Sequence, residues 1–295
     1  MAVTETGRNS PLRDRTVVVT GAARGVGAAL ARAAARRGAR VALLGHEQRG
    51  LDAVAATLPA PAMTAELDIT DAAALEQAAR EVRARLGAPS VVVANAGIAE
   101  GGPFALADPA LWRRVIDVNL TGSAFTARAF LADLEDTEGY FLQVASMAAF
   151  GAAPLMSAYC ASKSGVEAFA HALRAEVAHR GVAVGIAYLG WTDTDMIRDA
   201  DRHPVLRELR RHMGPAGRLH SADEVAARLV RAVERRRTAV YVPGWLRLGQ
   251  AARAALPPMV LRVSRHQLPR LSAREPFLPT GRLGAGGRAD AGRDA

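Results

Sequence analysis

The chain has 295 residues, half of them hydrophobic, so it can bury a large core, and a wholly disordered protein is excluded. Its one cysteine, Cys160, excludes an internal disulfide and indicates a reducing, cytoplasmic compartment. The formal net charge of +9 lies in residues 235–295, because the first 234 residues carry equal numbers of basic and acidic side chains, and we therefore expect no nucleic-acid binding by the domain they form.

Seven short apolar segments alternate with helical patterns, after residues 1–13, which we expect to be flexible. The predicted strands are Thr16–Thr20, Arg40–Leu44, Ala62–Asp68, Ser90–Ala94, Tyr140–Ala145, Ala183–Tyr188 and Ala239–Val242. The predicted helices are Gly25–Arg37, Asp71–Leu86, Pro109–Leu134, Tyr159–His179 and Ser221–Arg236. Runs of Val, Ala and Leu are typical of parallel strands buried on both faces. We predict an α/β fold: a doubly wound, Rossmann-type, mostly seven-stranded parallel sheet with helices on both faces.

The first strand leads through a glycine-rich turn into a helix. Gly21, Gly25 and Gly27 give the spacing Gly-x-x-x-Gly-x-Gly, with Arg24 and Val26 between them. Glycines let the backbone approach a pyrophosphate, and the free N–H groups at the start of the helix favour its negative charge. The turn therefore indicates dinucleotide binding, and a flexible connection that is merely rich in glycine is the alternative.

The end of the second strand bears on the choice of cofactor. An acidic residue there would hydrogen-bond the ribose hydroxyls of NAD and repel the 2′-phosphate of NADP. This chain has Gly45 at that position, while Arg24 and His46 offer a positive charge and a donor to a phosphate. Glu47 is the counter-argument, because its carboxylate could serve ribose hydroxyls. We expect NADP(H) to be favoured over NAD(H).

Tyr159 and the only lysine of the chain, Lys163, lie four residues apart on a predicted helix, so their side chains share one face. A tyrosine pKa near 10 is too high for ready proton exchange at neutral pH, and a neighbouring ammonium favours the phenolate. Ser146 follows the fifth strand, where its hydroxyl could hydrogen-bond a substrate oxygen. Asn119 lies inside a long helix, where a buried amide needs partners. Each signal is weak on its own.

Together these motifs resemble the short-chain dehydrogenase/reductase family over residues 14–244. The residues that carry the resemblance, in family order, are Thr20-Gly21-x-x-x-Gly25-x-Gly27, Asp68, Asn95-Ala96-Gly97, Asn119, Ser146, Tyr159-x-x-x-Lys163 and Gly190. The resemblance implies an NAD(P)(H)-dependent oxidoreductase that interconverts a carbonyl and a secondary alcohol on an apolar substrate. A non-catalytic dinucleotide-binding scaffold or redox sensor is the alternative, followed by a nucleic-acid binder acting through the arginine-rich tail.

The resemblance also implies roles for single residues. Tyr159 would exchange a proton with the substrate oxygen, Lys163 would lower the tyrosine pKa and hold the nicotinamide ribose, and Ser146 would orient the substrate oxygen. Asn119 would anchor a water in a proton relay. The remaining cofactor contacts would come from Gly21, Arg24, Gly25, Val26, Gly27, His46, Asp68, Ile69, Asn95, Ala96, Gly97, Gly190, Thr192 and Thr194. Because Leu189-Gly190 replaces the family's Pro-Gly, the placement of Thr192 and Thr194 is less secure.

Residues 191–220 correspond to the family's substrate lid, and the apolar residues among them suit an apolar substrate. The apolar residues are explained equally well if they pack the lid onto the domain and do not contact the substrate. The histidines show no metal-ligand spacing, so no metal site is expected. The resemblance further implies a homo-oligomer, either a dimer or a tetramer.

The composition of the chain changes after the last predicted strand, where arginines become frequent. Residues 245–271 place an apolar stripe beside arginines and are predicted to form a basic amphipathic extension, interrupted at Pro257-Pro258. Such a helix indicates peripheral contact with an anionic membrane surface, and docking on the domain or on a second subunit is the alternative. Residues 272–295 are rich in Gly and Arg and are expected to be disordered.

Overall fold

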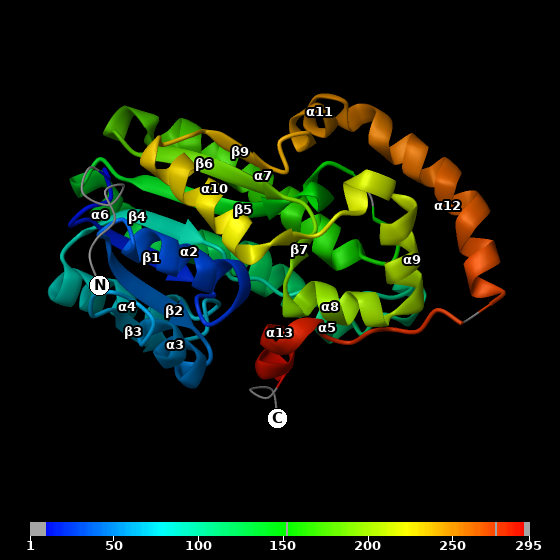
Figure 1. Ribbon diagram of the computed structural model, residues 1–295, viewed down its shortest axis with the longest axis horizontal. Coiled ribbons are helices and arrows are strands. Elements are labelled where there is room, and N and C mark those ends of the chain that lie inside the picture. The colour runs from blue at the N-terminus through cyan, green and yellow to red at the C-terminus, as the bar shows by residue number, and fades with distance from the viewer. Residues whose placement is uncertain (1–9, 152, 275, 292–295) are drawn as a thin grey trace.

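The computed structural model describes residues 10–151, 153–274 and 276–291 and contains a seven-stranded parallel sheet with helices on both faces (Figure 1). The strands in chain order are β1 (Thr16–Thr20), β2 (Arg40–Gly45), β3 (Met63–Glu66), β4 (Pro89–Ala94), β5 (Tyr140–Ser146), β6 (Ala183–Leu189) and β9 (Ala239–Val242). They lie in the order β3-β2-β1-β4-β5-β6-β9, and every neighbouring pair is parallel. The predicted Rossmann-type fold is confirmed.

The winding of the sheet reverses between β1 and β4. From β1 the chain proceeds outward to β3 on one side, and from β4 it proceeds outward to β9 on the other. The connections that leave the carboxyl ends of β1 and β4 therefore diverge, and a ligand crevice opens at such a point. The strand β1 is buried along its whole length, as a Val-rich strand covered on both faces should be.

Two groups of helices cover the two faces of the sheet. The first group is α2 (Gly25–Ala35), α3 (Gln48–Ala55) and α10 (Ala222–Glu234), and the second is α4 (Ala72–Leu86), α5 (Pro109–Ile116), α6 (Gly122–Asp136) and α7 (Ser157–Val177). Leu51 and Val225 of the first group belong to one hydrophobic cluster, and Phe130 and Val166 of the second group belong to the other. The core is thus divided by the sheet into two layers.

Capping residues mark the helix starts that the sequence predicts. The Asp71 carboxylate accepts a hydrogen bond from the backbone N–H of Ala74 at the start of α4, and the Ser221 hydroxyl accepts one from Glu224 at the start of α10. The single helix predicted over residues 109–134 is instead divided, because a π-helical turn at Asp117–Thr121 separates α5 from α6. Such a turn accommodates an additional residue, which hydrophobic periodicity does not reveal.

Residues 191–220, the expected lid, project from the end of β6. Two short parallel strands, β7 (Thr192–Asp193) and β8 (His220–Ser221), pair at their base. Between these strands lie α8 (Asp195–Arg202) and α9 (Pro204–His212), away from the edge of the sheet formed by β2 and β3 (Figure 1).

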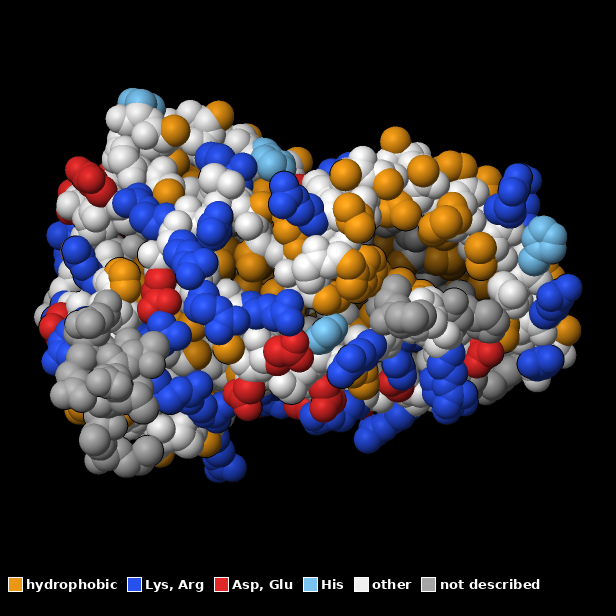
Figure 2. Space-filling model, turned by 45° about the horizontal axis from the view of Figure 1, so that its top comes forward, with side chains coloured by type: hydrophobic (Ala, Val, Ile, Leu, Met, Phe, Trp, Pro, Cys, Tyr) orange, Lys and Arg blue, Asp and Glu red, His pale blue; other side chains and the backbone are white. Residues whose placement is uncertain are grey.

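The basic extension is helical but interrupted, with α11 (Leu246–Ala251) followed by a 3-10 turn and α12 (Leu256–Ser272). The interruption precedes Pro257-Pro258, which lie in the first turn of α12, where a missing N–H costs no hydrogen bond. No residue of α12 is buried. Figure 2 shows hydrophobic side chains gathered around a hollow beside α11 and α12. Among the described helices none is long and apolar enough to cross a membrane.

The end of the chain differs from the expectation of disorder. Residues 276–291, which we call the C-terminal strap, return along the body to α13 (Gly284–Ala291), which lies beside α8 (Figure 1). Leu283 and Asp290 of this strap are buried. At the other end Ser10 and Leu12 are also buried, although we expected a flexible segment there. Residues 1–9, 275 and 292–295 lie outside the described residues.

Candidate active site

One cleft runs along the carboxyl ends of the strands and contains nearly all the residues singled out in the sequence. The expected residues that line it are Gly21, Arg24, Gly25, Val26, His46, Asp68, Ile69, Asn95, Ala96, Gly97, Ser146, Tyr159, Lys163, Gly190, Thr192 and Thr194. Gly27 and Asn119 lie behind its wall and contact residues that line it. Residues that are distant in sequence, from Gly21 to Thr194, thus meet at the crevice.

The glycine-rich turn shows why its glycines are needed. Gly21 has φ +64°, and a Cβ there would lie 2.8 Å from the Cα of Ala96. Gly25 has φ +54°, which side chains disfavour, and a Cβ on Gly27 would lie 2.6 Å from Nδ2 of Asn95. No side chain caps the start of α2. The turn therefore presents close-packed backbone and uncapped N–H groups to the cleft, and this arrangement fits a pyrophosphate.

Thr20 and Asn95 tie the ends of β1 and β4 together beneath this turn. The Thr20 hydroxyl accepts hydrogen bonds from the backbone N–H groups of Asn95 and Ala96, at 3.0 and 3.1 Å. In return the Asn95 side-chain amide donates to the carbonyl oxygens of Thr20 and Gly21, at 2.9 and 3.3 Å. These bonds fix the two walls of the crevice relative to each other.

Tyr159, Lys163 and Ser146 lie together at one end of the cleft. Lys163 Nζ is 5.6 Å from the centroid of the Tyr159 ring and donates to the carbonyl oxygen of Val144, at 3.3 Å. Burial raises the pKa of the Tyr159 phenol above its ordinary value, and a hydrogen bond with Ser146 partly opposes that rise. Burial also lowers the pKa of Lys163 to about 8. The phenol is therefore protonated at neutral pH and can act as a proton donor.

Asn119 is fully buried in the π-helical turn and has its polar atoms engaged by the protein. Its Oδ1 accepts from the backbone N–H of Ile98 at 2.8 Å, and its Nδ2 donates to the Ile98 carbonyl oxygen and to Ser162 Oγ, both at 2.9 Å. It thus joins the loop after β4 to α7, which carries Tyr159. Since both side-chain amide hydrogens are engaged, Asn119 could hold the water that the resemblance implies only through one of its oxygen atoms.

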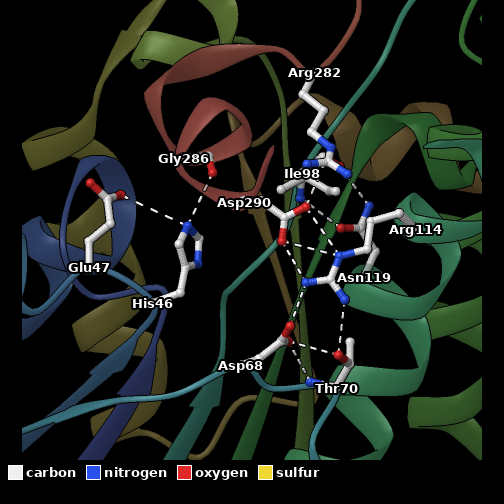
Figure 3. A network of polar contacts seen from close by, with 10 residues as sticks. All are labelled: His46, Glu47, Asp68, Thr70, Ile98, Arg114, Asn119, Arg282, Gly286 and Asp290. Atoms are coloured by element: carbon white, nitrogen blue, oxygen red, sulfur yellow. Dashed lines mark hydrogen bonds and ion pairs between the residues drawn. The ribbon is translucent and has the colours of Figure 1, made fainter. Parts of the chain in front are cut away.

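The other end of the cleft is built around an arginine that the sequence analysis missed. Arg114 of α5 donates to Asp68 Oδ2 at 2.6 Å and forms an ion pair with Asp290 of the C-terminal strap at 2.5 Å (Figure 3). Burial alone would raise the pKa of Asp68, but hydrogen bonds from Thr70 and Arg114 bring it below the ordinary value. Asp68 is therefore an ionised, firmly held side chain.

Arg24 and His46, the expected contacts of a 2′-phosphate, both line this part of the cleft. Arg24 forms an ion pair with Glu47 and lies 3.8 Å from Asp195, while its Nε is buried without a hydrogen-bond partner in the described part of the chain. His46 Nε2 is 3.2 Å from the carbonyl oxygen of Gly286 (Figure 3). A buried donor without a partner is costly, so this surface suits an anionic ligand group.

Residues of the C-terminal strap complete the lining, together with residues of α8. The cleft-lining residues that the sequence analysis did not single out include Arg114, Val118, Met196, Leu283, Gly284, Ala285, Gly286 and Asp290. The glycine-rich composition of the tail gave no indication of this position. The only signal in the sequence was the negative charge of Asp290 in an arginine-rich segment, which could have suggested that this residue pairs with an arginine of the domain.

The structure offers no support for metal or thiol chemistry at this site. Within the described ranges, no group of His, Cys, Asp and Glu lies close enough together to hold a metal ion. Cys160, next to Tyr159, contacts the backbone of Ala153, and burial raises the pKa of its thiol. Its thiolate is thus disfavoured, as in a packing residue.

Comparison with known proteins gives consistent results. A family model described as short chain dehydrogenase matches residues 15–204. The "Probable oxidoreductase EphD" of Mycobacterium tuberculosis is 33% identical over 237 residues, which are 76% of this chain and 40% of that protein. This chain therefore spans about two fifths of the length of that relative.

Other matches extend over most of their partners. The "2-(S)-hydroxypropyl-CoM dehydrogenase 3" of Xanthobacter autotrophicus is 32% identical over 227 residues, covering 74% of this chain and 89% of that protein. The crystal structure of gox2181 matches with a TM-score of 0.74 at 24% identity, covering 78% of this chain and 94% of that chain. At that identity the solved structure supports the fold alone.

Proposed function

The chain belongs to the short-chain dehydrogenase family, a family of NAD(P)-dependent oxidoreductases, and on this premise we propose that it interconverts a carbonyl and a secondary alcohol on an apolar substrate. The observation that carries the proposal is the single cleft that joins the glycine-rich turn after β1 to Tyr159, Lys163 and Ser146. A dinucleotide-coupled absorbance screen over ketones and alcohols tests it, with the Tyr159→Phe enzyme as the blank.

In this proposal the nicotinamide supplies or accepts the hydride when it is bound, and the protein handles the proton. During reduction the Ser146 hydroxyl holds the substrate oxygen, and the Tyr159 phenol donates its proton to that oxygen. The raised pKa of Tyr159 supports this direction, because the donor is protonated at neutral pH. The reverse reaction requires the phenolate and is therefore favoured by alkaline conditions.

Lys163 stabilises the charge that Tyr159 acquires when it gives up its proton. Its Nζ lies under the same ring and is buried, so the attraction between ammonium and phenolate is weakly screened. Its amine also lines the cleft, where we expect it to hold the nicotinamide ribose. Asn119 positions the loop at Gly97, where a Cβ would lie 3.5 Å from this amine.

We expect kcat/KM for reduction to fall as the pH rises through about 8, the pKa of Lys163. Below that pH the amine is charged and stabilises the phenolate, and above it the neutral amine does not. The profile of kcat/KM between pH 6 and 10 measures this. Lys163→Arg is the matched variant, because its guanidinium stays charged and should remove the decline near pH 8. A flat wild-type profile would contradict the role of Lys163.

For the cofactor we propose a preference for NADP(H). Gly45 ends β2 without a carboxylate, and Arg24 and His46 line the adjoining cleft. Glu47, which favoured NAD in the sequence, is paired with Arg24 and so is less available to ribose hydroxyls. The buried Nε of Arg24 supplies a further donor for a phosphate.

Gly45→Asp should reverse this preference. A Cβ at Gly45 would meet Leu51 Cδ2 at 3.4 Å and the Ala22 nitrogen at 3.9 Å, which are ordinary contacts, so the fold should tolerate the side chain. We expect the ratio of kcat/KM for NADPH to that for NADH to fall at least about tenfold, because the new carboxylate repels the 2′-phosphate. Gly45→Asn has nearly the same shape without the charge and should change the ratio far less. An unchanged ratio in the aspartate variant would refute the assignment.

The partners follow from the same site and surface. Met196 and Leu283 give the cleft apolar walls beside Tyr159, and these favour an apolar substrate.

A homo-oligomer remains our proposal from the family. Met259, Leu261 and Val263 are exposed on α12 among arginines, and this surface supports peripheral contact with anionic lipid.

A further inference from the structure

The C-terminal strap is attached across the mouth of the cleft by backbone pairing. The Leu283 N–H donates to the Ala99 carbonyl oxygen at 2.8 Å, and the Thr280 N–H donates to that of Gly101 at 2.7 Å. Between these two bonds, Glu100 and Arg282 form an antiparallel bridge. The strap thereby extends the loop that follows β4, the same loop that lines the cleft with Asn95, Ala96 and Gly97.

Beyond this pairing, a buried carboxylate fastens α13 to the domain. Asp290 is 2% exposed, and both its oxygens lie 3.1 Å from Arg114 Nε (Figure 3). Arg114 in turn donates to Asp68 and Thr70, on the connection that follows β3. A buried charge is tolerated only with such partners. The Asp290–Arg114 pair therefore anchors the free end of the strap to the floor of the cleft.

Further contacts fix the middle of the strap. Asp199 of α8 accepts a hydrogen bond from the backbone N–H of Gly284 at 3.0 Å and pairs with Arg288. Gly284 has φ +79°, and a Cβ there would lie 2.8 Å from the Met196 backbone, so the strap and α8 are in close contact. The Gly286 carbonyl oxygen contacts His46 on the opposite side of the cleft.

The helix α13 has little stability of its own. It is eight residues long and contains Gly286 and Gly287 in its interior, each of which costs about 1 kcal/mol relative to alanine. Isolated helices of this length are marginal in water even with alanine. The contacts with Arg114, Asp199 and His46 therefore hold the helix, and it can detach when they break.

The strap forms a wall of the cleft and does not fill it. The floor contributes Gly21, Asp68 and Tyr159, and the strap contributes Leu283 and Asp290, to the lining of one continuous cleft. At the substrate end, Leu283 is 3% exposed and lies in a cluster with Ala99, Ala200 and Leu206, against which Tyr159 and Met196 pack. A dinucleotide that reaches from the adenine end to Tyr159 would pass beneath residues 283–286.

We propose that the C-terminal strap is part of the binding site, closing over the bound dinucleotide, with Asp290 on Arg114 as the anchor that slows dinucleotide release. The proposal rests on the proposed function, because it takes the occupant of the cleft to be a nicotinamide dinucleotide. The strap opens from its C-terminal end, by loss of the Asp290 contact and melting of α13, and the β-bridge at Glu100 acts as the attached edge.

Stopped-flow fluorescence of NADPH release from the full chain tests the proposal. Asp290→Asn should release NADPH about tenfold faster than wild type, because the buried arginine loses one of its two charged partners. A chain that ends at Arg274 should release it at least as fast. Asp223→Asn is the matched control, because Asp223 is exposed on α10 away from the cleft, and its rate should equal that of wild type.

A second measurement does not depend on any variant. Trypsin cleaves after arginine, and α13 contains Arg288. In wild-type protein NADPH should slow cleavage after Arg288 about tenfold, because this site is cut only when the strap opens. Cleavage after the exposed Arg270 of α12 should be unaffected by NADPH.

The outcomes separate the strap from the proposed function. If wild type binds NADPH and all variants release it at the wild-type rate, the strap proposal is wrong and the proposed function is unaffected. Tighter binding by Asp290→Asn or by the shortened chain would also overturn it, since the strap would then obstruct the cleft. If wild type binds neither NADPH nor NADH, the proposed function fails and the strap proposal fails with it.

Discussion

Tyr159→Phe should lower kcat for ketone reduction by about a thousandfold or more and leave the Kd of NADPH near that of wild type. The substitution removes only the phenolic oxygen, which is the proton donor in the proposed reaction. The ring remains to fill its place beside Met196 and Leu283. Steady-state kinetics with NADPH, together with a fluorescence titration of NADPH binding, measures the two quantities separately.

Tyr241→Phe is the control for this experiment. Tyr241 lies on β9, stacks on Tyr188 with ring centroids 5.0 Å apart, and does not line the cleft. Its variant should keep full activity. If Tyr159→Phe kept the wild-type rate on a ketone that wild type reduces, the phenol would not be the proton donor. If wild type bound NADPH but turned over no member of the panel, the alternative of a non-catalytic scaffold would gain support.

Gly21→Ala should destabilise the folded protein by about 3 kcal/mol and weaken NADPH binding by at least about tenfold. Two costs combine at this position, because the residue has φ +64° and the new Cβ would lie 2.8 Å from the Cα of Ala96. Relief of the overlap moves the turn that is expected to hold the pyrophosphate. Denaturant unfolding measures the free energy of unfolding, and fluorescence titration measures NADPH affinity.

Gly214→Ala separates the two costs. Gly214 has φ +55°, close to that of Gly21, but nothing lies within 4 Å of its ideal Cβ. Its variant should lose only about 1 kcal/mol, the conformational cost of a positive φ. Equal losses at the two positions would show that the close approach to Ala96 contributes nothing, and the explanation of the turn would then be wrong.

The sequence predicted the sheet and the centre of the site because both follow short-range rules. Val-rich runs specify buried parallel strands, and such strands bring their carboxyl ends to one edge. Thr20, Asn95 and Ser146, which are distant in sequence, therefore had to lie near one another once their strands were assigned. The structure places them so.

The parts that the sequence did not predict depend on long-range contacts. The π-helical turn that buries Asn119 has no periodicity of its own, so residues 109–134 read as one helix. The strap has too many glycines to form a helix from local preference, and its order comes from Arg114 and Asp199. The composition of a segment predicts disorder without regard to residues elsewhere in the chain that bind it, and for this reason the expectation of disorder did not hold here.

The side chain that stabilises the phenolate in this proposal is also the chain's sole ε-amine. Lys163 is 5% exposed, lines the cleft, and has its pKa lowered to about 8, so near that pH about half of the molecules carry a neutral, nucleophilic amine there. A reagent that acylates ε-amines therefore has one target in the whole sequence. The extent of labelling at that residue would report how often the cleft is open, without any engineered probe.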